Sequence, residues 1–378
     1  MKIILAPDSF KGSMKASDVC DAMREGILKI FPDAEIISIP MADGGEGTVD
    51  SLVSATKGKF KPCKVLNPIG EKIFAKYGIL GDRKTAVIEM AAASGLQLIP
   101  QEKLNPLHTT TYGTGQLILD ALNSGCRNFI IGIGGSATTD GGSGMAQALG
   151  VKFFDKTGKE ITYPMNGKLI GKCESFTMDD IHPAVKNSRF TTACDVDNPL
   201  LGAKGAVYIY STQKGATEEM LPILEANMKH FYSIVEHTLD ISVIEYPGAG
   251  AAGGLGAGLI AFLGAKLKSG VNIVLNVVEF EKQTKDADLI FTGEGKIDSQ
   301  TPFGKTITGI LKIAKKNHIP VIAIAGKVDN NINELYKYGM KAIFSICDGP
   351  ITFEEAMKNG YKLTTKITEQ ICRILYLT

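Results

Sequence analysis

Short apolar segments alternate with segments of helical periodicity at the N-terminal end of the chain. Residues 2–6 form an apolar run, and residues 17–31 carry apolar side chains at helical spacing. Residues 36–41 and 47–56 repeat this order of strand and helix. Short apolar strands joined through helices are typical of a parallel sheet covered on both faces.

The C-terminal third repeats the same order of elements. We predict strands at residues 288–292, 321–325 and 342–346, and helices at residues 306–317, 331–338 and 353–375. The two early and three late strands together predict one doubly wound sheet.

The middle of the chain has a different pattern. Three strand-like segments follow one another with only short turns between them, at residues 60–66, 73–80 and 86–90. Such short connections allow antiparallel hairpins but not parallel crossovers. We therefore predict an α/β protein of two domains. Residues 1–66 and 286–378 would form a discontinuous domain with a parallel sheet, and residues 67–285 an inserted α/β domain with a mixed sheet.

Composition and charge restrict the classes of function. Of 378 residues, 44% are hydrophobic and 21% charged, which excludes a disordered chain. The formal net charge of +1 argues against a nucleic-acid or membrane-surface partner, since either usually needs a basic face. The seven cysteines stand singly, and the first residues hold too short an apolar run for export. We therefore expect reduced thiols and a cytoplasmic location.

One segment imitates a membrane-spanning helix. Residues 248–265 carry no charge over 18 positions, about the minimum length for a span. Seven of these residues are glycine, however, and glycine weakens a helix by about 1 kcal/mol relative to alanine. We predict a buried glycine-rich loop and helix instead.

Three polar loops follow predicted strands of the discontinuous domain, at residues 8–13, 42–47 and 293–298. In open parallel sheets, ligands bind beyond the carboxyl ends of the strands, so these loops should meet at one edge. Their candidate site residues are Asp8, Ser9, Lys11, Ser13, Asp43, Gly44, Glu46, Glu294, Gly295, Lys296 and Asp298. The alternative is three ordinary turns, because Asp, Gly and Ser are common turn residues. A carboxylate cluster costs stability unless a cation or a function compensates for it.

A glycine-rich segment at residues 131–144 is a second candidate site. Glycine lets the backbone approach an anion closely, and the N–H groups at the start of a helix attract phosphate or carboxylate. Its candidate anion-binding residues are Gly134, Gly135, Ser136 and Thr138.

The same segment fits a degenerate dinucleotide-binding fingerprint. Gly132, Gly134 and Ala137 have the required spacing, and Asp155 ends an apolar run about 20 residues further on. The intervening helix would have to contain three glycines, which makes a poor crossover helix. A second match at residues 248–253 is preceded by a proline that breaks the strand before it.

Hard oxygen ligands occur together in one more loop. Asp195, Asp197 and Asn198 follow a strand-like stretch, and Mg²⁺ usually takes one or two carboxylates plus substrate phosphates. The alternative is a turn rich in Asp, Asn and Pro. Lys305 belongs to a Gly-Lys-Thr sequence like the end of a P-loop, but Ser299 stands where that motif needs its first glycine. The five histidines form no pair with zinc-ligand spacing.

Six blocks of this sequence resemble the bacterial glycerate kinase family. They are APDSFKGS at 6–13, PMADGGEGT at 40–48, GIGGSAT at 132–138, ACDVDNPL at 193–200, GAAGGLG at 250–256 and TGEG at 292–295. The blocks are long and stand in order along nearly the whole chain. Members often have arginine where this chain has Lys296, which replaces a bidentate fork by a point charge.

The resemblance implies ATP-dependent phosphorylation of D-glycerate with Mg²⁺, with the 2-phosphate favoured over the 3-phosphate. It also implies a flavodoxin-like domain split around a second α/β domain, and we expect the active site in the cleft between the two. Lys11, Asp43 and Asp195 are our candidate catalytic residues, with Lys11 as an anion clamp. Asp195 and Asp197 are the candidate Mg²⁺ ligands. The candidates for binding substrate or nucleotide are Asp8, Ser9, Ser13, Gly44, Glu46, Gly134, Gly135, Ser136, Thr138, Asn198, Glu294, Gly295, Lys296, Asp298 and Lys305.

Two other functions stay open from the residues alone. A nicotinamide-dependent hydroxy-acid dehydrogenase would rest on the two glycine fingerprints. A sugar-acid-binding regulator would rest on the two-domain plan, although the chain has no DNA-binding segment. The sequence leaves open the oligomeric state, the hydroxyl that is phosphorylated and the identity of the general base.

Overall fold

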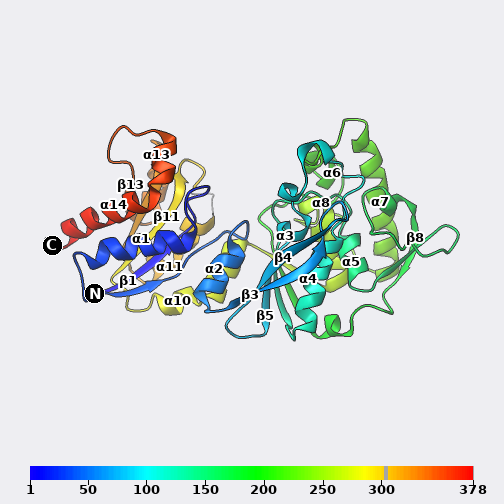
Figure 1. Ribbon diagram of the computed structural model, residues 1–378, viewed down its shortest axis with the longest axis horizontal. Coiled ribbons are helices and arrows are strands. Elements are labelled where there is room, and N and C mark those ends of the chain that lie inside the picture. Colours follow the sequence, from blue (N-terminus) through cyan, green and yellow to red (C-terminus); the bar gives the residue numbers. More distant parts are fainter. Residues whose placement is uncertain (302–304, 378) are drawn as a thin grey trace. The chain divides into compact units, whose positions relative to one another are not determined.

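The computed structural model describes residues 1–301 and 305–377. These residues form two compact units (Figure 1). The first unit contains residues 1–43, 50–57 and the part of 270–378 that is described, and the second contains residues 44–49 and 58–269. Each unit has its own sheet and its own buried core.

The unit boundaries differ from the predicted ones at residues 66 and 286. Strand β3 (Lys59–Leu66) pairs with β4 (Lys72–Ile79) along its whole length, so it belongs to the second unit. Helices α9 (Gly270–Val277) and α10 (Phe280–Gln283) belong to the first unit, where α9 contacts α11 (Lys305–Lys316). Pairing with β4 fixes the first boundary, and packing against α11 fixes the second.

The sheet of the first unit joins both ends of the chain. Its strands are β1 (Lys2–Pro7), β2 (Glu35–Ser38), β11 (Leu289–Ile297), β12 (Val321–Val328) and β13 (Met340–Ser345). All pairs are parallel, in the order β13-β12-β11-β1-β2. The predicted five-stranded sheet is therefore confirmed, and its order is that of flavodoxin-like folds.

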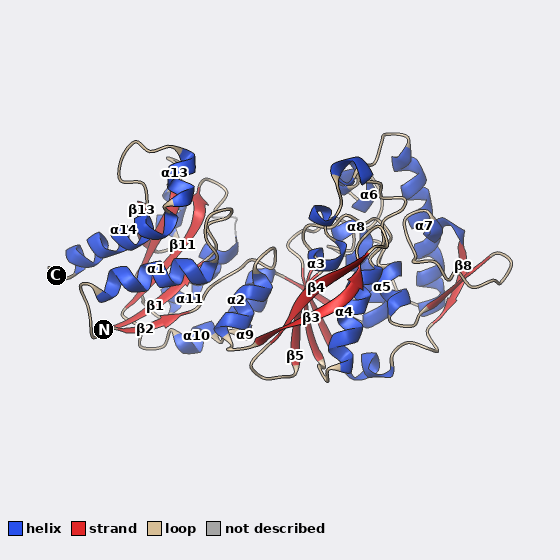
Figure 2. Cartoon of the chain, in the orientation of Figure 1, coloured by secondary structure: helices blue, strands red, loops and turns tan. Residues whose placement is uncertain are grey.

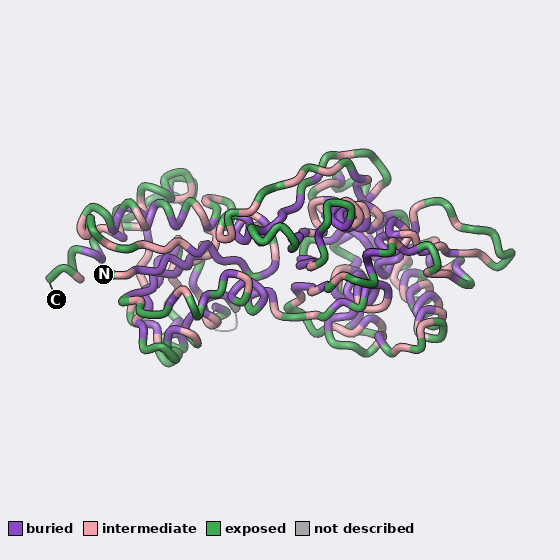
Figure 3. Tube along the Cα trace, turned by 90° about the horizontal axis from the view of Figure 1, so that it is seen from below, coloured by how far each residue is buried: buried purple, intermediate pink, exposed green. Residues whose placement is uncertain are grey.

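Helices cover both faces of this sheet. Alternate strand residues such as Ile3 and Leu5 join the core formed with α1 (Ala16–Leu28) and α14 (Gly360–Leu375), two helices that lie side by side (Figure 2). Ile4, which points to the opposite face, is also fully buried. Helix α11 contacts β11. Figure 3 shows that the chain becomes buried soon after the N-terminus.

Two predicted elements of this unit differ in extent. Strand β11 continues through Ile297, so residues 293–297 are strand and not loop, because β12 extends to Val328 and pairs with them. The predicted helix 353–375 is two helices, α13 (Phe353–Lys358) and α14, separated by Asn359. The break lets Gly360 approach Ser13 so closely that a Cβ would meet the Ser13 hydroxyl at 2.7 Å. The short helix α12 (Asn333–Lys337) also belongs to this unit, and so does α2 (Thr48–Ala55) from residue 50 onward.

The second unit has a mixed sheet, as predicted. Its order is β10-β9-β6-β5-β4-β3, with β3, β4 and β5 antiparallel and β5, β6, β9 and β10 parallel. The further strand bounds are β5 (Thr85–Glu89), β6 (Asn128–Gly132), β9 (Arg189–Ala193) and β10 (Lys266–Lys268). Strands β7 (Lys152–Asp155) and β8 (Cys173–Thr177) form a separate antiparallel pair.

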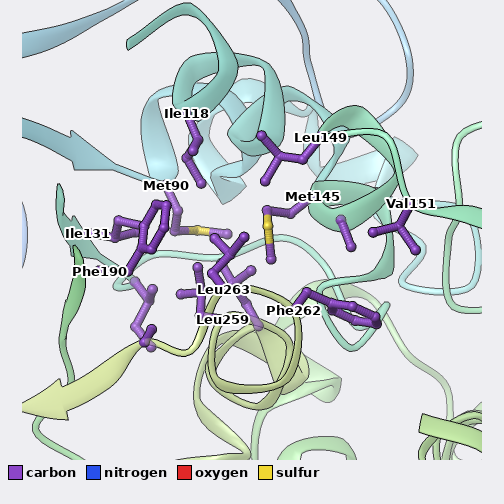
Figure 4. Close-up of a cluster of buried hydrophobic side chains, with 14 of the residues drawn as sticks. Met90, Ile118, Ile131, Met145, Leu149, Val151, Phe190, Leu259, Phe262 and Leu263 are labelled. Carbon is purple, nitrogen blue, oxygen red and sulfur yellow. The ribbon is translucent and has the colours of Figure 1, made fainter. Parts of the chain in front are cut away.

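Helices from several parts of the chain close the core of the second unit. They are α3 (Ala91–Ser94), α4 (Tyr112–Asn123), α5 (Ser143–Ala148), α6 (Ala206–Tyr210), α7 (Met220–Leu239) and α8 (Ala251–Leu263). Figure 4 shows side chains of α4, α5 and α8 meeting those of β6 and β9. Helix α8 and the loop before it hold the uncharged segment, which is largely buried as predicted. Among the described helices, none combines the length and apolarity that crossing a membrane requires.

Candidate active site

The first unit places two carboxylates on neighbouring strands, one directly after β1 and the other inside β11. Asp8 follows the last residue of β1, and its backbone N–H donates to the Gly293 carbonyl at 2.8 Å. Glu294 is the next residue of β11. Because Pro7 and Gly293 are partners in register, Asp8 and Glu294 occupy equivalent positions on adjacent strands.

Hydroxyl groups hold both carboxylates. The Ser9 N–H donates to Asp8 Oδ1 at 2.6 Å, and Thr306 Oγ1 donates to Asp8 Oδ2 at 3.2 Å. Thr301 Oγ1 donates to Glu294 Oε1 at 2.7 Å. Sequence reasoning missed both threonines. Thr306 is distant in sequence from Asp8, and Thr301 lies in a loop without a recognisable motif.

The two carboxyl groups titrate near neutral pH. Burial raises the pKa of Asp8 to about 6 and that of Glu294 to about 7. The negative charge of Asp43 raises both pKa values further, and Asp298 adds to the effect on Glu294. The structure therefore brings Asp8, Asp43 and Glu294 together within the first unit, although Glu294 lies inside β11 and not in a loop after it as predicted.

The loop after β1 carries the candidate clamp. Lys11 is exposed, and its backbone lies against Gly295, where a Cβ would come within 3.2 Å of Lys11 N. The Ser13 hydroxyl donates to the Met357 carbonyl at 2.7 Å. In this structure Ser13 therefore holds α13 to the loop.

Lys296 lies in a network of ion pairs. Its Nζ is 2.8 Å from Asp298 Oδ2 and 3.2 Å from Asp329 Oδ2. Lys327 Nζ is 3.2 Å from Asp329 Oδ1. Sequence reasoning missed Lys327 and Asp329, although they follow the apolar run 321–325 just as the three selected loops follow theirs.

In the second unit, a short segment packs against the end of β6. The Gly44 carbonyl would lie 2.7 Å from a Cβ at Gly132, so only glycine leaves room for it. The Val49 N–H donates to Glu89 Oε1 at 3.0 Å. Glu46 is exposed between these contacts.

The glycine-rich loop between β6 and α5 is exposed at its start and buried at its end. Gly134 and Gly135 are exposed, and Gly135 has φ +73°. Ser136 and Thr138 are buried, and among the described atoms the Thr138 hydroxyl has no hydrogen-bond partner. Only the first part of the loop is open to an anion in this structure.

Two buried ionisable residues, Asp140 and Lys214, support the same loop. Asp140 accepts hydrogen bonds from the N–H groups of Thr111, Gly142 and Gly144, and burial raises its pKa. Lys214 is fully buried and donates to the Thr138 carbonyl at 2.6 Å. Burial lowers the pKa of Lys214 to about 7. Nothing in the local sequence around Lys214 marks it as buried, so sequence reasoning missed it.

The dinucleotide fingerprints have structural explanations. Strand β7, which ends at Asp155, pairs with β8 in a separate sheet, so β6, α5 and β7 do not form a dinucleotide-binding unit. In the second match, a Cβ at Gly253 would lie 1.9 Å from the Thr138 carbonyl. The two glycine-rich segments need glycine because they pack against each other.

The loop after β9 holds the predicted Mg²⁺ ligands. Asp195 and Asp197 are exposed. Asn198 is engaged inside the loop, since its Nδ2 donates to Lys204 O at 2.8 Å and its Oδ1 accepts from Tyr210 at 2.6 Å. Within residues 1–301 and 305–377, no group of three or more His, Cys, Asp or Glu side chains has the geometry to hold a metal ion. Lys305 begins α11, but its side chain lies outside the described part of the chain.

These features define an α/β enzyme with a flavodoxin-like unit, an acidic site at the carboxyl ends of its strands and a second unit rich in glycine loops. The sequence matches the glycerate kinase family over residues 3–376. The chain belongs to this family, and it is a kinase that transfers a phosphoryl group to an alcohol.

Individual relatives are similar over nearly their whole lengths. A glycerate 2-kinase of Escherichia coli (strain K12) is 48% identical over 373 residues, which are 99% of this chain and 96% of that protein. A glycerate kinase of Bacillus subtilis (strain 168) is 47% identical, with 100% and 98% covered. A crystal structure from Salmonella typhimurium LT2, provisionally described as glycerate kinase 2, superposes with a TM-score of 0.91 at 42% identity, covering 99% of this chain and 98% of that one.

Proposed function

We propose that the protein phosphorylates D-glycerate with ATP and Mg²⁺, and that the 2-hydroxyl is the preferred acceptor. Family membership and the printed names of the relatives support the substrate. The observation that carries the chemistry is the pair Asp8 and Glu294, whose pKa values lie near 6 and 7. A general base works best when its pKa lies near the operating pH.

In the proposed reaction Glu294 accepts the proton of the attacking hydroxyl. Thr301 fixes the side chain through Oε1, and burial, together with the neighbouring carboxylates, keeps the pKa of Glu294 high enough to take a proton at neutral pH. Asp8 and Asp43 act through their charges, because they disfavour the ionised form of Glu294. The sequence predicts a catalytic role for Asp43 and leaves the base open, and the raised pKa of Glu294 supports Glu294 as the base.

Phosphoryl transfer otherwise requires positioning and charge stabilisation. Lys11 is exposed near Gly295 and is suited to clamp a phosphate or carboxylate. The exposed backbone of Gly134 and Gly135 is suited to bind an anion through N–H groups. These roles remain predictions.

The donor set suits Mg²⁺ bound together with a nucleotide. Mg²⁺ usually keeps several waters and binds through one or two carboxylates plus substrate phosphates, so it needs no closed protein cage. Such a cage is absent from the described residues, whereas Asp195 and Asp197 are exposed carboxylates on one loop. When bound, Mg²⁺ would neutralise charge on the transferring phosphates. The expectation that one active site takes residues from both units stays a prediction.

The decisive experiment is incubation of the protein with D-glycerate, ATP and Mg²⁺, followed by phosphorus NMR. A phosphate on carbon 2 couples to one proton and gives a doublet, whereas a phosphate on carbon 3 couples to two and gives a triplet. L-Glycerate serves as the control for stereochemistry. Formation of NADH from D-glycerate and NAD, without phosphorylation in the ATP arm, would instead support the dehydrogenase.

A further inference from the structure

Two lysines stand opposite each other on neighbouring strands of the first unit. Lys296 on β11 and Lys327 on β12 are partners in register. Their side chains are 50% and 69% exposed. Like charges directly opposite on a sheet repel each other, so this arrangement is unfavourable unless an anion lies between them.

One carboxylate bridges the two ammonium groups. Asp329 Oδ2 is 3.2 Å from Lys296 Nζ, and Asp329 Oδ1 is 3.2 Å from Lys327 Nζ. Each oxygen of a single carboxylate thus meets one lysine. The spacing of the two lysines therefore fits a carboxylate, or two oxygens of a phosphate, at this position.

The bridge lies on the same side of the sheet as the proposed base. Side chains at positions i and i+2 of a strand point to the same face, so Lys296 projects from the face that carries Glu294. Asp298, which pairs with Lys296, is close enough to Glu294 for its charge to raise the pKa of Glu294. An anion bound at the lysines would lie beside the carboxylate cluster.

We propose that Lys296 and Lys327 form a binding site for the carboxylate or phosphate group of a substrate, and that Asp329 occupies this site in the free protein. The identity of the substrate rests on the proposed function. Displacement of the Asp329 side chain by a ligand lowers the stability of the fold little, because ion pairs between exposed side chains contribute about 0–1 kcal/mol. Lysine binds as a point charge, so it accepts either kind of anion.

Two variants separate this role from a structural one. Lys327→Met and Asp329→Asn remove the same ion pair, and a structural role would move both variants in the same direction. If Asp329 occupies a ligand site, Lys327→Met raises the KM of one substrate by roughly tenfold or more, the scale of a hydrogen bond to a charged group. Asp329→Asn removes a competitor and lowers the same KM, with kcat nearly unchanged in both variants.

The control is Lys337→Met, because Lys337 is 73% exposed and pairs with Glu334 at 2.9 Å in the same unit. It should leave both KM values unchanged. A higher KM for D-glycerate in Lys327→Met assigns the site to the substrate carboxylate, and a higher KM for ATP assigns it to a phosphate. Unchanged KM values, or changes in the same direction in both test variants, overturn the proposal.

Binding of inorganic phosphate gives a readout that does not depend on turnover. Titration followed by NMR should show weaker binding in Lys327→Met and tighter binding in Asp329→Asn. If the wild-type protein does not phosphorylate D-glycerate, the proposed function fails and this titration still decides the anion site. Equal phosphate binding by the wild type and both variants then overturns it.

Discussion

At the scale of single residues, the most informative feature is the unequal environment of similar carboxyl groups. Asp8 and Glu294 are held by hydroxyl groups in a site where burial and neighbouring charge raise their pKa values, whereas Asp195 and Asp197 are exposed. Shifted pKa values concentrate at functional sites. This contrast is why we assign proton transfer to the first unit.

Glu294→Gln should lower kcat by roughly a hundredfold or more, because that is the usual contribution of one acid–base group. In the wild type, kcat/KM should rise with pH through about 7, where Glu294 loses its proton. The variant should lose this dependence. Asp8→Asn should keep it but shift it to lower pH, since one repulsive charge is removed. Glu334→Gln, an exposed change in the same unit, is the control, and an unaltered pH profile in Glu294→Gln would exclude Glu294 as the base.

Glu294 should also make stability depend on pH. Its pKa is about 7 in the folded state and about 4.5 when unperturbed, so between these values the folded protein binds more protons than the unfolded chain. Stability contributed by this group is present below about pH 4.5 and is lost as pH rises to about 7. Glu294→Gln should therefore raise stability at pH 8 by about 1–2 kcal/mol, after allowance for solvent screening, and change it little at pH 4. Calorimetric melting at both pH values tests this, and equal melting temperatures at pH 8 would contradict it.

The sequence was sufficient to predict that Asp8, Asp43 and Glu294 lie together, because the rule for parallel sheets needs only the approximate positions where strands end. It did not predict that residues 293–297 are strand or that residues 44–47 belong to the second unit. It was insufficient for Thr301, Thr306, Lys327 and Asp329. The first two act through side-chain hydrogen bonds formed after folding, and the other two lie beyond a strand whose true length depends on its partner. The roles of all these residues remain to be tested.

At the scale of elements, apolar periodicity predicted the five strands of the first unit's sheet, and tertiary packing decided their full lengths. Strand β11 is longer than its apolar run, because its polar end pairs with β12. The glycine-rich loops are also explained at this scale. Helix α8 begins with left-handed residues at 252–254, which fit against the loop at 138–142.

Gly253→Ala should destabilise the second unit severely. Its φ of +68° strains any other residue, and the added Cβ would lie 1.9 Å from the Thr138 carbonyl. Gly264 at the end of the same helix has φ +63° with no atom within 4 Å, so Gly264→Ala measures the backbone strain alone, about 1–2 kcal/mol. The Gly253 variant should lose at least 1–3 kcal/mol more through overpacking. Equal losses in urea denaturation would show that the close contact does not matter.

At the scale of the whole molecule, the chain passes between its units at residues 43–44, 49–50, 57–58 and 269–270. The sequence predicted two domains with one inserted in the other, but it could not predict that residues 44–49 join the second unit. That assignment depends on contacts such as Gly44 with Gly132, and no local pattern marks these contacts.

Variants of Asp43 and Asp195 test whether both units contribute residues to one reaction. Asp43→Asn and Asp195→Asn nearly preserve side-chain size while removing a charge. If both carboxylates serve the reaction, each variant should lower kcat by roughly a hundredfold or more with little change in melting temperature. Asp179→Asn, an exposed change in the second unit, is the control. Near-normal turnover by folded Asp195→Asn would remove the second unit's acidic loop from the mechanism.

The position of β1 between β2 and β11 has a consequence for synthesis on the ribosome. β1 emerges long before its partner β11, which begins only at Leu289, so at about 5–20 residues per second one edge of β1 stays unpaired for roughly 15–60 seconds. The second unit ends at residue 269 and is complete in sequence before that partner appears. A nascent chain that stalls in between therefore carries a finished second unit beside unpaired apolar strands, which makes it a client for chaperones and proteases.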